Sequence, residues 1–292
     1  MSVEVKAASP LRKLAIILEM IKFEHTIFAL PFALASALVA ANGLPSWRTL
    51  LWILVAMVGA RSAAMTFNRI VDARIDAANP RTAQRALPRG LVSSGAAWLF
   101  AGVSAGLLVV AARMLNPLAF ALSPVALIAV MGYSYFKRFT SLSHLWLGLC
   151  LGIAPVGAWI AVKGEIGFAS MVLSAGVMLW TAGFDIIYSM QDLEFDRKAG
   201  LFSLPAKVGP SLALTISRVS HAGMVGMLVW FGLLTGRGAV YYAGAAFVGA
   251  FLIYEQSLVS PRDISRVNTA FFTMNGCVSL AMLAFVVVDV FL

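Results

Sequence analysis

The chain has 292 residues, of which 61% are hydrophobic and 12% charged, and its formal net charge is +9. Soluble domains carry about 25% charged residues, so this composition excludes a soluble protein and indicates a chain that crosses a membrane several times. The basic residues fall in loops between apolar segments, which argues for membrane orientation rather than nucleic-acid binding. Cys150 and Cys277 lie inside apolar runs, so we expect no disulfide framework.

The apolar runs predict an all-α integral membrane protein with nine transmembrane helices. Most runs approach the roughly 20 residues that an α-helix needs to cross a bilayer. No linker divides them, so residues 1–292 are predicted to form a single domain, and the first run is interpreted as a retained helix rather than a signal peptide. In chain order the predicted spans are approximately 16–41, 48–67, 95–112, 117–136, 144–162, 166–188, 212–235, 238–256 and 268–291.

The distribution of basic residues predicts a cytoplasmic N-terminus. With that orientation sixteen Lys and Arg side chains fall in cytoplasmic segments, which is the asymmetry of the positive-inside rule. The two long connections, roughly 68–94 and 189–211, then also face the cytoplasm. The opposite side holds only four basic residues: Arg48, Arg113, Lys163 and Arg237.

Two acidic motifs follow long apolar runs, in a chain where charge is scarce. Asn68, Asp72 and Asp76 are spaced four residues apart, as are Asp192 and Asp196, so each set lines one face of a helix. Like charges at this spacing destabilise an isolated helix by about 0.2–0.5 kcal/mol per pair, which suggests that cations lie between them. Carboxylate and amide oxygens suit Mg²⁺, whose shell substrate phosphates and water commonly complete. The five residues are therefore candidate magnesium ligands.

Basic residues near the acidic motifs suit a diphosphate. Arg85, Lys137 and Arg138 could clamp a pyrophosphate and stabilise it as it leaves, although Arg138, like Arg81 and Arg89, could equally be a positive-inside residue.

Two further charged residues lie inside apolar runs. Arg61 precedes Asn68 by two helical turns, and a buried Arg needs an anionic partner, for which a substrate carboxylate would serve. Asp185 lies in the run that ends near Tyr188, and an intramembrane carboxylate is a functional candidate by default.

The two motifs, in this order and on one membrane face, resemble those of the UbiA superfamily of intramembrane aromatic prenyltransferases. The resemblance covers essentially the whole chain, and the amino-terminal part is similar to the 4-hydroxybenzoate polyprenyltransferase branch and its futalosine-pathway relatives. The matching segments are Asn68-x₃-Asp72-x₃-Asp76, Asn79-Pro80-Arg81-Thr82, Tyr135-Phe136-Lys137-Arg138-Phe139-Thr140, Tyr188-Ser189-Met190-Gln191-Asp192, Asp192-x₃-Asp196 and Glu24-His25-Thr26-Ile27-Phe28-Ala29-Leu30-Pro31.

The resemblance implies a fold and a set of roles. The helices would bundle around a central cavity, with the active site facing the cytoplasm, in the inner (plasma) membrane of a bacterium. Both motifs would hold Mg²⁺ against the diphosphate of a polyprenyl donor, and their aspartates would carry the catalysis. Arg85 and Lys137 would contact the diphosphate, Arg61 the acceptor carboxylate, and Asp185 and Tyr188 would line the pocket near the reacting carbon.

The predicted activity is Mg²⁺-dependent transfer of a polyprenyl group from polyprenyl diphosphate to the ring of an aromatic acid. The first acceptor to consider is 4-hydroxybenzoate, in ubiquinone biosynthesis. 1,4-Dihydroxy-6-naphthoate or 1,4-dihydroxy-2-naphthoate, in menaquinone biosynthesis, is the alternative, because it would satisfy the same Arg61.

Other classes of function fit less well. A transporter of a cation or anionic solute would need charges towards both faces, and a CDP-alcohol phosphotransferase would carry its acidic motifs in one continuous stretch. The scattered His25, His144 and His221 are interpreted as structural. The expected partners are the two substrates and the lipid bilayer, not nucleic acid, and the sequence leaves the oligomeric state open.

Overall fold

The computed structural model of the protein describes residues 10–21 and 26–292, and every regular element in these ranges is a helix. Residues 22–25, which include His25 and the start of the Glu24–Pro31 segment, lie outside the described residues. The elements are α2 (Pro10–Met20), α3 (Thr26–Ala41), α4 (Trp47–Val71), α5 (Ala73–Ala78), α6 (Ser94–Leu115), α7 (Pro117–Phe136), α8 (Ser143–Lys163), α9 (Phe168–Ser189), the 3₁₀ turn η2 (Met190–Asp192), α10 (Leu193–Ala199), α11 (Leu204–Val208), α12 (Pro210–Thr235), α13 (Ala239–Ser257), the π-helix η3 (Thr269–Met274) and α14 (Asn275–Phe291).

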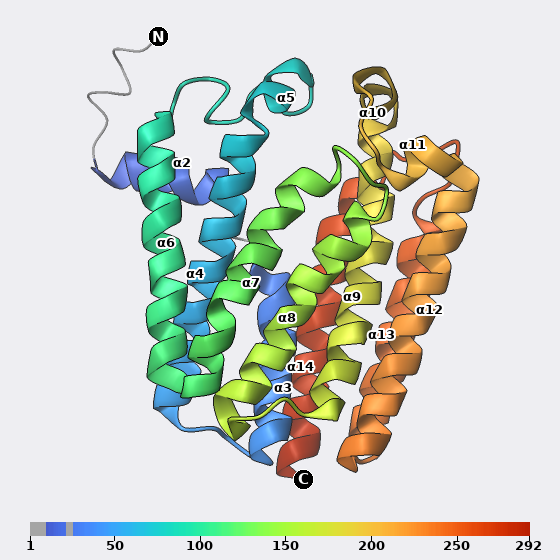
Figure 1. The fold of residues 1–292 in the computed structure, drawn as a ribbon. Coiled ribbons are helices and arrows are strands. Elements are labelled where there is room, and N and C mark those ends of the chain that lie inside the picture. The colour runs from blue at the N-terminus through green and yellow to red at the C-terminus, as the bar shows by residue number, and fades with distance from the viewer. Residues whose placement is uncertain (1–9, 22–25) are drawn as a thin grey trace.

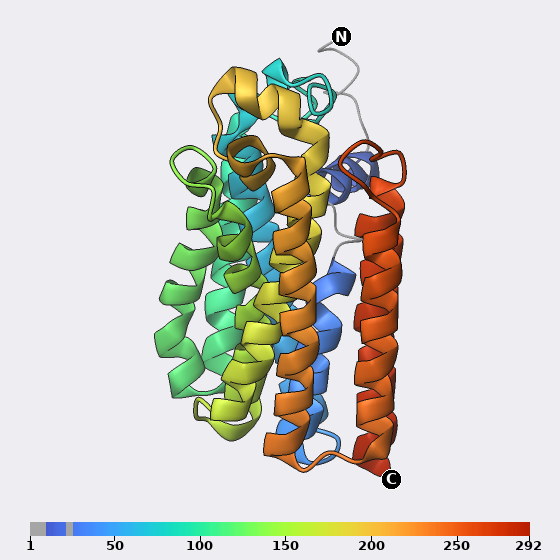
Figure 2. The same ribbon diagram turned by 90° about the vertical axis from the view of Figure 1, so that its right-hand side faces the viewer.

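The long helices form one bundle with roughly aligned axes (Figures 1 and 2). Their contacts close a circuit in which α3 packs on α8, α8 on α9, α9 on α12, α12 on α13, α13 on α14, and α14 back on α3. The helices α4, α6 and α7 pack on one another and, through α7, on α8. The short helices α5, α10 and α11 all lie at one end of the bundle, and the chain terminates at the other end (Figure 1).

The long helices have the length and surface of membrane spans. Among the described residues, seven segments are long and apolar enough to cross a bilayer, and they contain α4, α6, α7, α8, α9, α12 and α14. Large apolar side chains such as Leu99, Ile128 and Ile253 project outwards, as expected for a surface that faces lipid. The chain is thus an all-helical, multi-pass membrane protein. α3 and α13 run with these helices in the bundle but fall outside that set of seven.

The first predicted span, 16–41, is wrong in its amino-terminal part. The structure places a separate helix there, α2, which lies across the bundle axis near one end (Figure 1), and the helix within the bundle begins only at Thr26. Ile16, Ile17 and Met20 of α2 pack against the bundle, whereas Glu19 is exposed. A charged residue at the centre of a span costs about 2.5–3.5 kcal/mol, so the charged residues of this run favour a surface helix.

Of the seven segments that are long and apolar enough to cross a bilayer, the one that contains α9 is the most enclosed. In this segment, 67% of the apolar stretch is buried inside the molecule, against 11–39% in the other six segments. Trp180 and Phe184 of α9 meet Phe28 and Phe32 of α3 in an aromatic core with ring centroids 5.1–6.4 Å apart. The second acidic motif therefore follows a helix that packs in the core of the fold.

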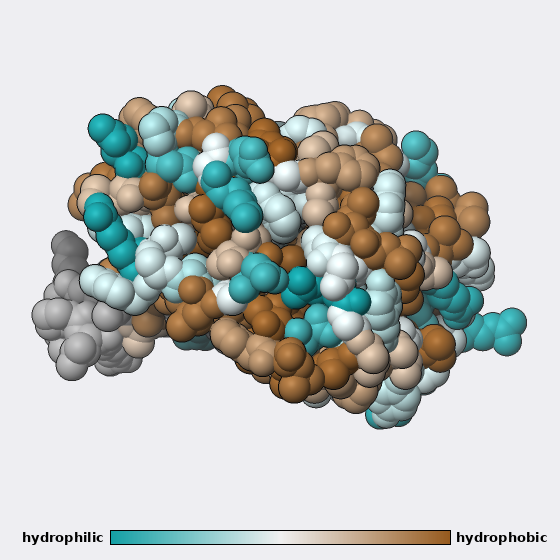
Figure 3. Space-filling model, turned by 90° about the horizontal axis from the view of Figure 1, so that it is seen from below, coloured by the Kyte–Doolittle hydropathy of each residue, from teal (hydrophilic) through white to brown (hydrophobic). Residues whose placement is uncertain are grey.

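The end of the bundle where the chain terminates is chemically different from the end that bears α5 and α10. Seen from the end where the chain terminates, hydrophilic residues are spread among hydrophobic ones (Figure 3). Arg237, next to the end of α12, lies 3.8 Å from Asp289 of α14, and Asp289 accepts the backbone N–H of Tyr241 at 3.1 Å. These contacts tie the ends of three helices together. Both acidic motifs lie at the opposite end of the bundle.

Candidate active site

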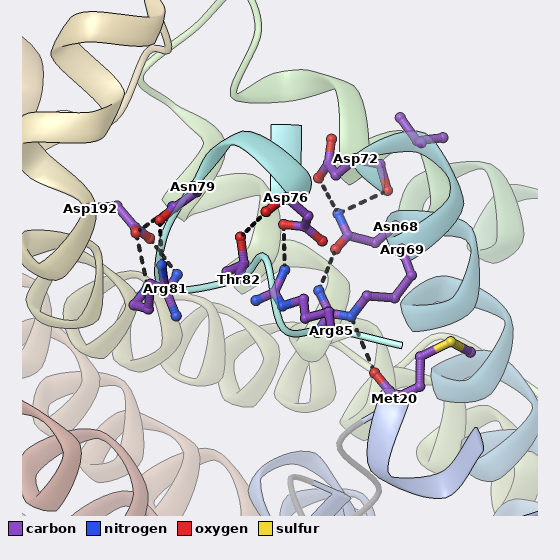
Figure 4. A network of polar contacts seen from close by, with 12 residues as sticks. Met20, Asn68, Arg69, Asp72, Asp76, Asn79, Arg81, Thr82, Arg85 and Asp192 are labelled. Atoms are coloured by element: carbon purple, nitrogen blue, oxygen red, sulfur yellow. Dashed lines mark hydrogen bonds and ion pairs between the residues drawn. The ribbon is translucent and has the colours of Figure 1, made fainter. Parts of the chain in front are cut away.

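The first acidic motif lies on a nearly continuous helix, as predicted. α4 ends at Val71, Asp72 has a non-helical conformation (φ −92°, ψ 5°), and α5 begins at Ala73. The helical pattern nevertheless continues across the break, because the Asp72 N–H donates to Asn68 O (2.9 Å) and the Asp76 N–H to Asp72 O (2.7 Å). The three ligand candidates therefore follow one face, and Asn68 Nδ2 donates to Asp72 Oδ2 at 2.9 Å (Figure 4).

The second motif has the same local design. α9 gives way to the 3₁₀ turn η2, and Asp192 there has nearly the same backbone conformation as Asp72 (φ −98°, ψ 3°) before α10 begins. Asp192 and Asp196 are buried, whereas Glu194 between them is exposed. The spacing of four residues thus separates the two buried aspartates from their solvent-facing neighbour.

Each of the four motif aspartates forms an ion pair with a different basic side chain. Two of these cations come from the segment after α5 and two from the end of α7. The pairs are Asp72–Arg138 (2.8 Å), Asp76–Arg85 (2.7 Å), Asp192–Arg81 (2.5 Å) and Asp196–Lys137 (2.8 Å). Acidic and basic groups are therefore interleaved in one cluster, which we call the ion-pair cluster.

Arg81 joins the two motifs. Its Nε and Nη2 donate to the two carboxylate oxygens of Asp192, and its Nη1 donates to the Tyr188 hydroxyl at 3.2 Å. Asn79 Nδ2 donates to Asp192 Oδ1 at 2.9 Å (Figure 4). Partial burial lowers the pKa of Arg81, but the contact with Asp192 outweighs it and raises that pKa above the ordinary value. The sequence analysis left Arg81 undecided, and its bidentate contact places it in the site.

The end of α7 makes a second bridge between the motifs. Arg138 donates to Asp72 Oδ1 and to the Val71 carbonyl, both at 2.8 Å, and Lys137 Nζ lies 2.8 Å from Asp196 Oδ1. Burial raises the pKa of Asp72, although Arg138 and Asn68 pull it in the opposite direction. Neighbouring residues of one helix terminus thus contact both motifs.

Arg69 supports the first motif, and the sequence analysis did not single it out. Its side chain is buried, with Nη1 donating to Asn68 Oδ1 at 3.3 Å and Nε donating to the Met20 carbonyl at 3.2 Å (Figure 4). Arg69 therefore satisfies a carbonyl at the end of α2 and orients the amide of Asn68. In the sequence, the only indication that Arg69 belongs to the site was its position as a basic residue inside an otherwise acidic motif.

Three predicted substrate-binding residues lie deeper in the bundle than the aspartates. Arg61 is half-buried in α4, two turns before Asn68. On α9, Asp185 pairs with His144, whose Nδ1 lies 2.7 Å from Asp185 Oδ2, and Tyr188 stacks on Phe271 with centroids 4.1 Å apart. The structure thus brings Tyr188 to the ion-pair cluster through Arg81 and leaves Arg61 and Asp185 below it.

The donor set fits a magnesium ion shared with a phosphate. Within residues 10–21 and 26–292, no three His, Cys, Asp or Glu side chains converge to form a complete metal cage. Mg²⁺ commonly uses one or two carboxylates, with phosphate and water as the remaining ligands. Asp76 Oδ2 and Asp196 Oδ2 are buried and receive no hydrogen bond, and such an oxygen is costly unless a proton or a cation reaches it.

Comparisons with known proteins give one family. Residues 29–277 match the model of the UbiA prenyltransferase family. The 4-hydroxybenzoate octaprenyltransferase of Vibrio vulnificus (strain CMCP6) is 33% identical over 253 residues, which cover 86% of this chain and 88% of that protein. The enzyme of the same description from Thiobacillus denitrificans (strain ATCC 25259 / T1) is 32% identical over 234 residues, covering 80% and 79%.

Two solved structures have a similar fold. The apo structure of a UbiA homolog from Aeropyrum pernix K1 aligns with a TM-score of 0.82 and 36% identity, covering 91% of this chain and 98% of that one. A UbiA homolog from Archaeoglobus fulgidus bound to GPP and Mg²⁺ aligns with a TM-score of 0.77, covering 95% of this chain and 100% of that one. At 20% identity the second likeness concerns the fold alone.

Proposed function

Because the chain belongs to the UbiA prenyltransferase family, we propose that it transfers a polyprenyl group from polyprenyl diphosphate to the ring of 4-hydroxybenzoate. The observation that carries this proposal is the ion-pair cluster, where two acidic motifs and four basic side chains meet at one end of a membrane bundle. The names of the curated relatives support 4-hydroxybenzoate as the acceptor.

The diphosphate binds at the ion-pair cluster. Asn68, Asp72 and Asp76 on one side and Asp192 and Asp196 on the other hold Mg²⁺, which when bound neutralises the negative charge of the diphosphate. The A. fulgidus relative, described with GPP and Mg²⁺, supports this choice of ion.

The basic residues of the cluster then change partners. Arg85, Lys137 and Arg138 each contact a carboxylate in the structure. With Mg²⁺ on those carboxylate oxygens, the three side chains would contact the phosphate oxygens, where Arg offers paired donors and Lys a point charge. The number of favourable charge contacts is preserved, and the diphosphate is held more strongly as negative charge grows on it.

The chemistry occurs just below the cluster. The allylic C–O bond breaks, and its electron pair leaves with the diphosphate. Tyr188, which packs against Phe271, and Phe184, 5.4 Å from Phe271, supply aromatic rings in this region. Such rings stabilise a nearby cation and exclude the water that would quench it. The ring carbon ortho to the phenol attacks the allylic carbon, while Arg61 holds the acceptor carboxylate.

We also propose the topology that this chemistry needs. Residues 1–292 form a single domain whose nine long helices cross a bacterial inner membrane around a central cavity, with the N-terminus and the ion-pair cluster on the cytoplasmic side. The placement of Arg74, Arg89, Arg197, Lys198 and Lys207 at the cluster end supports this orientation.

The test uses purified protein in lipid vesicles with Mg²⁺ and a radiolabelled polyprenyl diphosphate. Separate reactions receive 4-hydroxybenzoate, 1,4-dihydroxy-6-naphthoate, 1,4-dihydroxy-2-naphthoate or no acceptor. We expect a prenylated product and one diphosphate per product from 4-hydroxybenzoate. Product from a naphthoate alone would keep the prenyltransferase assignment and replace the acceptor. Failure to release diphosphate with every acceptor would overturn the proposed function.

A further inference from the structure

The pair formed by His144 and Asp185 is buried below the ion-pair cluster. Asp185 precedes Asp192 by seven residues, which places it about 10 Å deeper along the helix. His144 is the second residue of α8 and is 4% exposed. An ionisable side chain at such depth needs a specific partner. Arg61 likewise precedes Asn68 by seven residues, so each motif has a charged side chain about two helical turns before its first residue.

The hydrogen bonds of His144 fix the position of its proton. The backbone N–H of Leu204 donates to His144 Nε2 at 3.1 Å. A backbone amide can only donate, so Nε2 is the acceptor nitrogen of a neutral ring and the proton resides on Nδ1. Nδ1 then donates to Asp185 Oδ2 at 2.7 Å. His144 is thus locked between a donor on one side and a carboxylate acceptor on the other.

This geometry assigns different tasks to the two oxygens of Asp185. Oδ2 is held by His144, the side chain is 16% exposed, and Oδ1 is the oxygen that His144 does not contact. On α9, Asp185 is one turn before Tyr188, which contacts Arg81 of the ion-pair cluster. A carboxylate held at this depth lies below Asp192 of the ion-pair cluster.

We propose that His144 is a positioning residue that aims Asp185 at the acceptor ring, so that Asp185 Oδ1 takes the proton which the ring loses. After the ring carbon bonds to the allylic carbon, that carbon still carries hydrogen. The C–H electron pair returns to the ring, aromaticity is restored, and Oδ1 accepts the proton and later releases it to water. This inference rests on the proposed function, and it replaces the structural role that the sequence suggested for His144.

The competing account is that His144 only anchors the segment after α10. Leu204 begins α11, and in the same segment the Phe202 N–H donates to the Lys137 carbonyl at 2.8 Å. In that account the Nε2 contact is the important one. The two nitrogens of His144 can be tested separately, because an Asn amide occupies roughly the position of Nδ1 and a Gln amide roughly that of Nε2.

The experiment compares His144→Asn, which retains a donor for Asp185, with His144→Gln, which retains an acceptor for Leu204. Prenylation is measured with 4-hydroxybenzoate and with the same acid deuterated at both carbons ortho to the phenol. We expect His144→Asn to retain most of the turnover. We expect His144→Gln to lose about tenfold or more in kcat, a modest part of what a general base contributes, with both KM values nearly unchanged and a primary isotope effect that the unaltered protein lacks.

Several outcomes would overturn the inference. Activity in His144→Gln with loss in His144→Asn would assign the anchoring role instead. Slow turnover in His144→Gln without an isotope effect would mean that proton removal is not affected. If His144→Gln does not fold, Asp185→Asn serves in its place, because it can accept from His144 but cannot take a proton, and it must show the same loss of kcat. Prenylation by the unaltered protein is the control that separates failure of this inference from failure of the proposed function.

Discussion

At the residue scale, Asp192 links the second motif to the segment after α5. It accepts hydrogen bonds from Asn79 and, in bidentate form, from Arg81, and it belongs to the second motif. Two roles follow for its carboxylate: it holds the segment after α5 in place, and in the proposed function it binds Mg²⁺. The metal-binding role depends on its negative charge rather than on its size.

Asp192→Asn is therefore expected to reduce prenylation by at least about 100-fold, the scale on which removing one electrostatic group acts in an active site. The fold should remain, because an amide fills the same volume. The measurement is labelled-product formation in vesicles, with thermal stability in detergent as the folding check. Glu194→Gln is the matched control, because Glu194 is exposed two residues away and should retain full activity. Normal turnover in Asp192→Asn would remove the metal-binding role.

Arg61 and Arg85 provide a separate test of the two substrate subsites. Arg61 lies two turns below the aspartates, whereas Arg85 contacts Asp76 within the ion-pair cluster. We expect Arg61→Ala to raise the KM for the aromatic acid much more than the KM for the donor, and Arg85→Ala to do the reverse. Steady-state kinetics with each substrate varied in turn measure both effects. A donor-specific effect of Arg61→Ala would move Arg61 to the diphosphate.

At the element scale, the π-helix η3 has an identifiable cause. Asn275 Nδ2 donates to the carbonyls of Ala270 (3.1 Å) and Phe271 (3.0 Å) and to Oε1 of Glu255 on α13 (3.1 Å). The wider turn of a π-helix leaves such carbonyls in need of donors, and π-helices often accompany functional sites. Here η3 presents Phe271 to Tyr188, so a contact between α13 and α14 sets one wall of the proposed active site.

Asn275→Leu is expected to destabilise the protein by about 1–3 kcal/mol, because it removes the side chain that donates to the buried Glu255. Thermal unfolding in detergent is the measurement, with Thr273→Leu as the control, since Thr273 is exposed in the same π-helix. Prenylation should also fall in Asn275→Leu as Phe271 shifts. Equal stability of the two variants would contradict this role for Asn275.

At the scale of the whole molecule, both acidic motifs and all four ion-pair partners lie at one end of the bundle. That arrangement supports one-sided chemistry over transport, because a transport path needs groups that serve both faces in turn. It also means that the membrane orientation decides from which compartment the diphosphate comes. The orientation is testable without any assay of activity.

We expect a cysteine introduced at Glu194 to react with a membrane-impermeant reagent only from the cytoplasmic side, and one at Glu165 only from the outside. Both positions are exposed and lie at opposite ends of the bundle. The background is a chain with Cys150 and Cys277 replaced by serine, and labelling is compared between inverted and right-side-out vesicles. Reversed labelling would refute the cytoplasmic site.

Removal of the metal tests the cluster as a unit. After chelation with EDTA we expect prenylation to stop and to return on addition of Mg²⁺, because carboxylates and phosphates alone would repel one another. Thermal unfolding is the control measurement. It should show that the protein stays folded without metal, because the existing ion pairs remain. Turnover that persists after thorough chelation would contradict the proposed mechanism.

The sequence by itself determined the class of protein, most of the helix positions and the contents of the two motifs. These depend on local patterns: apolar runs of bilayer length, spacing of four residues, and the placement of basic residues in loops. The one wrong helix, in the run 16–41, arose because hydropathy alone does not separate a membrane span from an apolar helix on the surface.

Only the tertiary structure decided which side chains meet. Arg81 and Asp192 are 111 residues apart, and His144 and Asp185 are 41 apart. Neither pair has a local signature, because helix packing and the course of the loops bring the partners together. The charge of a residue can be read from the sequence, but its partner cannot, and in a membrane interior the partner determines what a charged group can do.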